Sequence, residues 1–226
     1  MMGRSHTDRK YDSELNRLRE QVLLMGARVE EMLGMSMRAF RERDAAAAKR
    51  TIAADQQIDQ LEMEIDELAL KILARRQPVA SDLRFITTTL KLVTDLERIG
   101  DLGVNICERV LELTREGTLD ADSAITRLAD AACAMLRDAL DAFVQRDAIK
   151  ANQVMERDQT VDAYYAQLFP ELVTHMMSDP AVVYPATRLQ SIGKYLERIA
   201  DHATNIAEMV VFMVKGQDVR HGGALE

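Results

Sequence analysis

Several residue types that shape other classes of protein are scarce in this chain of 226 residues. There are only 10 glycines and 4 prolines, tryptophan is absent, and aromatic residues make up 4% of the sequence. Ala, Leu, Met, Glu and Arg are plentiful, and all of them favour helices. The sequence contains no Asn-Gly hairpin turn and no convincing strand-like alternation. The composition therefore predicts an all-α protein.

The chain also lacks the features of nucleic-acid-binding, membrane-spanning and secreted proteins. Its formal net charge is −8, whereas a nucleic-acid-binding protein usually carries a basic face. No apolar run reaches the roughly 18 residues that a membrane span requires, and residues 1–11 are too polar for a signal peptide. Cys107 and Cys133 lack metal or redox spacing, so we expect buried free thiols. These absences favour a cytoplasmic protein with no nucleic-acid partner.

Apolar residues at helical spacing predict six long helices. The expected helices cover about 8–43, 44–76, 83–116, 120–145, 147–177 and 185–215, with 178–184 as a connector. Asp44 and Ser81 are suitable N-caps because their side chains can accept hydrogen bonds from the first free amides of a helix. Pro78 should end the second helix, and Gly117 and Gly216 the third and sixth.

One charged helical motif occurs twice, 100 residues apart. Residues 96–110 and 196–210 share nine of fifteen positions. The identical positions of the first copy are Leu96, Glu97, Arg98, Ile99, Asp101, Asn105, Ile106, Glu108 and Val110. We infer two tandem three-helix bundles related by internal duplication. The predicted boundaries are 8–117 and 118–216, followed by a loose tail at 217–226.

The repeated motif places polar residues on one face of a helix. Positions i, i+4, i+8 and i+11 fall within roughly 80° of one another, so Glu97, Asp101 and Asn105 share a stripe. An Asp-x3-Asp pair, Asp55 with Asp59, recurs in the preceding helix of the second half as Asp158 with Asp162. Neighbouring helices would therefore bring four carboxylates onto one surface patch in each half.

Four carboxylates in one patch repel one another. Two like charges 5 Å apart cost about 3 kcal/mol at an effective dielectric near 20. A metal ion or a small metal cluster would cancel that charge, and carboxylate and amide oxygens suit hard cations. The alternative is an ordinary solvated acidic face. Arg98 and Arg198, which are also repeated, are expected to pair with the acids and orient them. His202, whose counterpart is Leu102, is expected to be a surface or packing residue.

Enzyme chemistry has little support in the sequence. No Gly-rich phosphate loop, nucleophile elbow or Glu-x-x-His di-iron motif is present. The leading hypothesis is a non-enzymatic adaptor. A metal-dependent phosphatase, in which paired carboxylates hold two ions, is the alternative. A purely structural bundle with solvated acids is a third possibility.

The repeated motif also carries a resemblance to a known family. The stretches from Asp95 to Glu108 and from Tyr195 to Glu208 resemble the PhoU family, bacterial accessory proteins of phosphate signalling, and the resemblance extends over essentially the whole chain. It implies metal clusters bound at paired Glu/Asp-x3-Asp motifs, with iron, manganese, magnesium and zinc as candidates. The metal-binding residues that it implies are Asp55, Asp59, Glu97, Asp101 and Asn105, and Asp158, Asp162, Glu197, Asp201 and Asn205.

The resemblance further implies a role in phosphate homeostasis. Members of the family are commonly dimeric cytoplasmic regulators that limit phosphate uptake and restrain the phosphate-starvation response. They are understood to link the ATPase subunit of the phosphate transporter to a membrane sensor histidine kinase. We therefore expect a homodimer that touches the membrane only through those complexes. Gly100, Gly103 and Cys107, each replaced by Ala in the second copy, make the first copy less regular.

Overall fold

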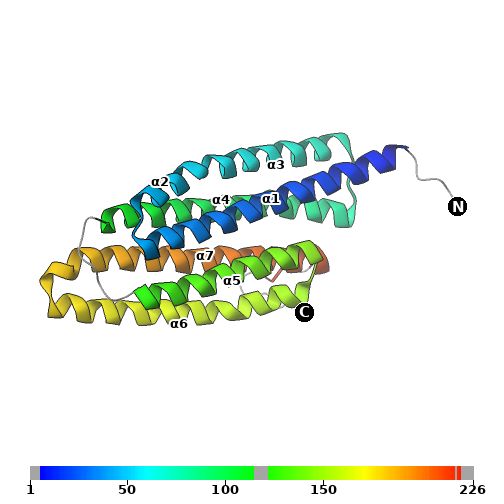
Figure 1. The fold of residues 1–226 in the computed structure, drawn as a ribbon. Helices are drawn as coiled ribbons and strands as arrows, with labels where there is room; N and C mark the ends of the chain where they lie inside the picture. Colours follow the sequence, from blue (N-terminus) through cyan, green and yellow to red (C-terminus); the bar gives the residue numbers. More distant parts are fainter. Residues whose placement is uncertain (1–5, 115–121, 217, 220–226) are drawn as a thin grey trace.

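The computed structural model describes residues 6–114, 122–216 and 218–219, and it is helical as the composition predicts (Figure 1). Its elements are α1 (His6–Glu42), α2 (Ala45–Ala54), α3 (Gln56–Arg75), α4 (Ala80–Leu113), α5 (Asp122–Gln145), α6 (Ala148–Ser178), the short 3₁₀ helix η1 (Pro180–Val182) and α7 (Val183–Lys215). No helix in this described part is long and apolar enough to cross a membrane.

Two bundles of antiparallel helices lie side by side, as the duplication predicts (Figure 1). The first contains α1, the α2–α3 segment and α4, and the second contains α5, α6 and α7. Helices α4 and α7, which carry the repeated motif, pack against each other along the seam between the bundles, and α1 also contacts α5. Both copies of the motif therefore lie at the centre of the molecule.

The corners that enter α2 and α6 are built in the same way in both halves. Asp44 and Asp147 are N-caps, and each accepts hydrogen bonds from two amides of the helix that follows. The residues before them, Arg43 and Arg146, both have φ 52°. This left-handed conformation ends the preceding helix, where glycine is the usual residue. The predicted cap at Asp44 is confirmed, and the same local solution is used twice.

The predicted helix at 44–76 is interrupted at Asp55, which separates α2 from α3. The Asp55 amide bonds to the Ile52 carbonyl at 3.3 Å, a three-residue step that tightens the helix locally. Gly100 of α4 faces this turn, and a Cβ there would lie 3.2 Å from Asp55 Oδ1. The absent Cβ lets the turn approach α4. Ala200 is the counterpart of Gly100, and α6 continues without a break.

Two helices begin before their predicted starts. Val79, not Ser81, is the N-cap of α4, and its side chain makes no capping hydrogen bond. Helix α7 begins at Val183, so Pro185 lies in its first turn, where the missing proline amide leaves no hydrogen bond broken. The predicted connector contains η1, which is capped by Asp179. Gly216 ends α7 with φ 72°, as predicted.

Some sequence predictions fall outside the described residues. Gly117 and most of the loose tail belong to this group, and α4 ends at Leu113, three residues before the predicted end. Both cysteines are free, but only Cys107 is fully buried, whereas Cys133 is partly buried.

The core is formed by the predicted apolar stripes. On α1, residues such as Leu18, Val22, Met25 and Val29 are completely buried. A side chain of this size contributes about 1.5–3 kcal/mol when it is removed from water. The inner faces of α4 and α7 are equally buried, from Leu96 and Leu196 onward. Burial of these faces fixes the orientation of the polar stripes, which must turn toward the outer surfaces and the edges of the seam.

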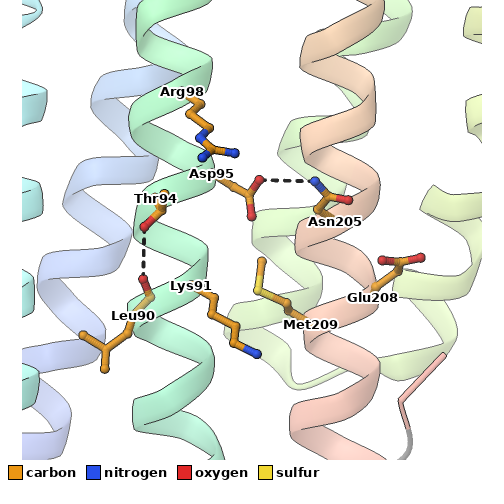
Figure 2. A pocket seen from close by; sticks show the side chains of 8 residues that line it. All are labelled: Leu90, Lys91, Thr94, Asp95, Arg98, Asn205, Glu208 and Met209. Carbon is orange, nitrogen blue, oxygen red and sulfur yellow. Dashed lines mark hydrogen bonds between the residues drawn. The ribbon is translucent and has the colours of Figure 1, made fainter. Parts of the chain in front are cut away.

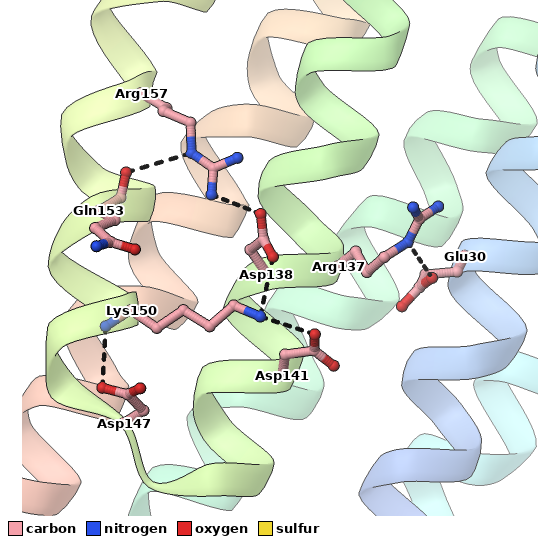
Figure 3. A network of polar contacts seen from close by, with 8 residues as sticks. All are labelled: Glu30, Arg137, Asp138, Asp141, Asp147, Lys150, Gln153 and Arg157. Carbon is pink, nitrogen blue, oxygen red and sulfur yellow. Dashed lines mark hydrogen bonds and ion pairs between the residues drawn. The ribbon is translucent and has the colours of Figure 1, made fainter.

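Ion pairs join α5, α6 and α1 (Figure 3). Lys150 Nζ of α6 lies 3.0 Å from Asp138 Oδ1 and 2.8 Å from Asp141 Oδ2, and Arg157 also pairs with Asp138. Arg137 of α5 reaches Glu30 of α1 across the two halves at 3.5 Å. The pairs around Asp138 form a network, which stabilises the α5–α6 hairpin more than isolated surface pairs would.

Candidate functional site

The first acidic patch lies where the α2–α3 segment meets α4. Burial first, and then the charges of Asp59 and Asp101, raise the pKa of Asp55 to about 6. Burial also raises the pKa of Glu97, with further contributions from Asp101, Glu62 and Asp59. These mutual effects require the carboxylates to be close together. The structure thus groups the four acids that the sequence predicts for this patch.

Glu62 is a member of the first acidic patch that the sequence analysis missed. Its pKa is raised by burial and by the charges of Asp66, Asp59 and Asp101. It lies seven residues after Asp55, so the same i, i+4, i+7 spacing that groups Asp55 and Asp59 would have included it. Asp66 extends the stripe by one further turn. The first acidic patch consists of Asp55, Asp59, Glu62, Asp66, Glu97 and Asp101.

The second acidic patch, formed by Asp158, Asp162, Glu197 and Asp201, lies between α6 and α7. Burial raises the pKa of Asp201, and the charges of Glu197 and Asp158 raise it further. The pKa of Asp158 is raised by burial and by Asp162 and Glu197. The structure therefore also brings the four predicted acids of this half together.

The second acidic patch differs from the first in its charge. Lys194 Nζ lies 2.6 Å from Glu197 Oε2 and covers the ring of Tyr165. Tyr165 and Phe169 occupy the positions of Glu62 and Asp66 in the first patch. Lys194, which lies one turn before Glu197, was not among the predicted residues of this patch. This patch therefore has fewer acids and contains its own cation.

The two predicted asparagine ligands do not share one environment. Asn205 Nδ2 donates to Asp95 Oδ1 at 3.3 Å, so this side chain points to the α4–α7 seam rather than to the second acidic patch. Asn105 is half-buried on α4. Within the described residues, no three Asp, Glu, His or Cys side chains already converge tightly enough to enclose a metal ion. Metal binding at either patch therefore requires side chains to move inward.

His202 is a buried residue of the seam. Its Nδ1 lies 2.7 Å from Asp95 Oδ1, and the exposed fractions of the two side chains are 10% and 14%. The expectation that His202 is a packing residue without a shared role in the second acidic patch agrees with this position. Asp95 of α4 thus contacts both His202 and Asn205 of α7, and it ties the two halves together.

A groove runs along the same seam (Figure 2). Its volume is about 630 Å³. The lining residues are Leu90, Lys91, Thr94, Asp95 and Arg98 of α4 with Asn205, Glu208 and Met209 of α7. Arg98 lines this groove, and its charge also offsets part of the rise in the pKa of Glu97 that burial causes, so it acts on the first acidic patch as expected, without a direct ion pair in the described part of the chain.

A family model and named relatives both match this chain along most of its length. The PhoU domain matches residues 22–110 and 125–210, one match in each half. The chain is 40% identical over 216 residues to the phosphate-specific transport system accessory protein PhoU homolog of Rhizobium meliloti, covering 95% of this chain and 91% of that protein. It is 35% identical over 221 residues to the Escherichia coli accessory protein PhoU, covering 98% and 92%.

Crystal structures of PhoU proteins have the same fold. The structure from Pseudomonas aeruginosa superimposes with a TM-score of 0.89 at 39% identity, covering 92% of this chain and all of that chain. The structure of the phosphate transport system regulatory protein PhoU from Streptococcus pneumoniae gives a TM-score of 0.86 at 31% identity, covering 92% and 99%.

The duplicated helical fold defines a non-enzymatic protein of the accessory and regulatory class. The chain belongs to the PhoU family, the accessory and regulatory proteins of phosphate transport. The phosphatase alternative is therefore set aside, because the family is not enzymatic. The boundaries at 8–117 and 118–216 stay predictions, and each matched segment lies within one of them.

Proposed function

We propose that this protein is a cytoplasmic adaptor that couples the ATPase subunit of a phosphate transporter to a sensor histidine kinase. In this role it lowers phosphate uptake and restrains the phosphate-starvation response. Relatives named as accessory proteins of the phosphate-specific transport system support the transporter partner. The observation that carries the proposal is the presence of two acidic patches on equivalent faces of a PhoU fold, which offer two related docking surfaces on one chain.

The acidic patches are also the proposed metal sites. Their donor set consists of carboxylates, the ligand type that hard cations prefer. Burial first, and then the charges of neighbouring carboxylates, raise the pKa values of Asp55, Glu97, Asp158 and Asp201, so added positive charge would favour their ionised forms. A bound cation would supply that charge and draw the carboxylates together. The residues present therefore fit a metal ion, and the first acidic patch, which has no lysine, fits it better.

Removal of one acid from each patch should abolish stoichiometric metal binding. We expect purified protein to retain iron, manganese, magnesium or zinc after dialysis, and the Asp101→Ala, Asp201→Ala double variant to retain at least tenfold less. Elemental analysis by mass spectrometry measures the content. Glu20→Ala, which removes an exposed acid of α1 outside both patches, serves as the control. Equal metal content in all three proteins would contradict the metal sites.

Partner binding should be measured with the purified ATPase subunit and with the cytoplasmic part of the kinase. We expect each to be retained by immobilised protein, and the acidic double variant to retain at least one of them several-fold less. Parallel experiments with EDTA separate a metal-dependent contact from direct recognition of the carboxylates. Retention of neither partner, with or without chelator, would rule out the adaptor role.

A further inference from the structure

The α4–α7 groove lies apart from both acidic patches and is not needed for the adaptor role proposed above. It is open to solvent on the edge of the seam, and its volume of about 630 Å³ falls in the range of small-molecule sites. Lys91 and Arg98 project from α4 into it, two helical turns apart and roughly 10 Å along the helix axis (Figure 2).

The cations of the groove have unused hydrogen-bonding capacity. Within the described part of the chain, Lys91 and Arg98 are exposed, and the charge of Arg98 acts on Glu97, where it offsets part of the rise in pKa that burial causes, without a hydrogen bond between the two side chains. An ammonium group offers three N–H donors and a guanidinium group five. Both side chains are exposed, so they can turn toward a ligand without breaking a hydrogen bond in the described part of the chain.

The acids of the groove, in contrast, are already engaged. Asp95 Oδ1 is shared by His202 Nδ1 at 2.7 Å and Asn205 Nδ2 at 3.3 Å. Glu208 also has an interaction partner in the protein. The hydrogen-bond donors that face a ligand are the two cations of α4, beside the apolar side chains of Leu90 and Met209, while Asp95 and Glu208 keep their charge but are held by partners in the protein. This combination suits an anion that carries an apolar body.

We propose that this groove binds an organic phosphate of nucleotide size. The phosphate groups lie on Lys91 and Arg98, since both cations give charge-assisted hydrogen bonds to phosphate oxygens. The organic part covers Leu90 and Met209. The separation of the two cations matches a ligand longer than one orthophosphate ion. This inference goes beyond the adaptor role, which stands or falls with the partner-binding experiments.

The groove can be tested with ADP as the probe. Isothermal titration calorimetry at low ionic strength, with EDTA present to keep cations from the acidic patches, should detect ADP binding to the full chain. Lys91→Met and Arg98→Gln should each weaken binding at least tenfold. Arg198→Gln is the matched control, because Arg198 is the repeat counterpart of Arg98 but lies outside the groove lining. It removes the same charge and should change affinity less than twofold.

Two further probes separate the parts of the ligand. Inorganic phosphate and adenosine should each bind at least tenfold more weakly than ADP. Equal affinity for phosphate and ADP would overturn the organic part of the proposal. Equal losses in Arg98→Gln and Arg198→Gln, or no ADP binding, would overturn the site itself. Unfolding transitions followed by circular dichroism should be the same for all variants, since the three side chains are exposed.

Discussion

Replacement of Asp95 by alanine should lower the free energy of unfolding by about 2–4 kcal/mol. The carboxylate is the one acceptor that His202 Nδ1 and Asn205 Nδ2 share at 2.7 and 3.3 Å, and only 14% of the side chain is exposed. Its removal leaves a buried imidazole without its partner at the seam between the halves. Urea unfolding followed by circular dichroism measures the loss.

A double-mutant cycle separates the buried contact from general damage to the seam. His202→Leu introduces the residue that the first copy has at position 102. When Asp95 and His202 are both replaced, only the exposed Asn205 loses its acceptor, so Asp95→Ala should cost about 1 kcal/mol or less in the His202→Leu background. An equal cost in both backgrounds would show that the Asp95–His202 contact does not stabilise the seam.

Asp55→Asn should have the opposite effect and stabilise the protein. The pKa of Asp55 in the folded protein is about 6, above the usual value of aspartate, so folding favours the protonated carboxyl. The ionised Asp55 carboxylate therefore destabilises the folded protein. This destabilisation is absent below the pKa of Asp55 in the unfolded chain, grows as the pH rises, and is complete above pH 6. After allowance for solvent screening of a partly exposed group, we expect a gain of about 1–2 kcal/mol at pH 7.5 and little gain near pH 4.

Unfolding in urea at both pH values, with EDTA present, measures this difference. Asp55 makes no side-chain capping bond, so its replacement by asparagine removes no hydrogen bond of the helix end. Glu20→Gln, a neutral substitution of an exposed acid on α1, should give no pH-dependent change. When a metal ion binds the first acidic patch, Asp55→Asn should be less stable than the unchanged protein, because the variant lacks one ligand. An identical effect of Asp55→Asn at both pH values would contradict the repulsion.

Periodicity and repeats were sufficient to predict the helices, the duplication and the two groups of four acids. Each of these depends on spacing within one helix or on equality between two copies. Contacts that depend on the exact rotation of packed helices could not be predicted in this way. Asn205 belongs to the predicted stripe by spacing, yet its side chain bonds to Asp95 of α4 across the seam.

The other departures also arise from tertiary contacts. The break at Asp55 follows the close approach of the α2–α3 turn to Gly100, which a single-helix pattern does not reveal. Helix α4 begins at Ala80 without a polar cap, so the usual sequence signal was absent at its true start. Lys194 pairs with Glu197 but is replaced by Thr94 in the first copy, so the repeat gives no signal for it.

The antiparallel packing of α4 on α7 has a consequence for how this chain arose. Arg84 near the start of α4 contacts Met213 near the end of α7, and Glu112 near the end of α4 pairs with Arg188 near the start of α7. The two helices therefore run in opposite directions, and the repeats are related by an approximate two-fold axis. That is the isologous geometry of a symmetric homodimer, here joined into one polypeptide. In a single polypeptide, the two sides of the seam can carry different residues at equivalent positions. The Asp95–His202 pair, whose mates are Tyr195 and Leu102, is a one-sided contact that a symmetric dimer would have had to make twice.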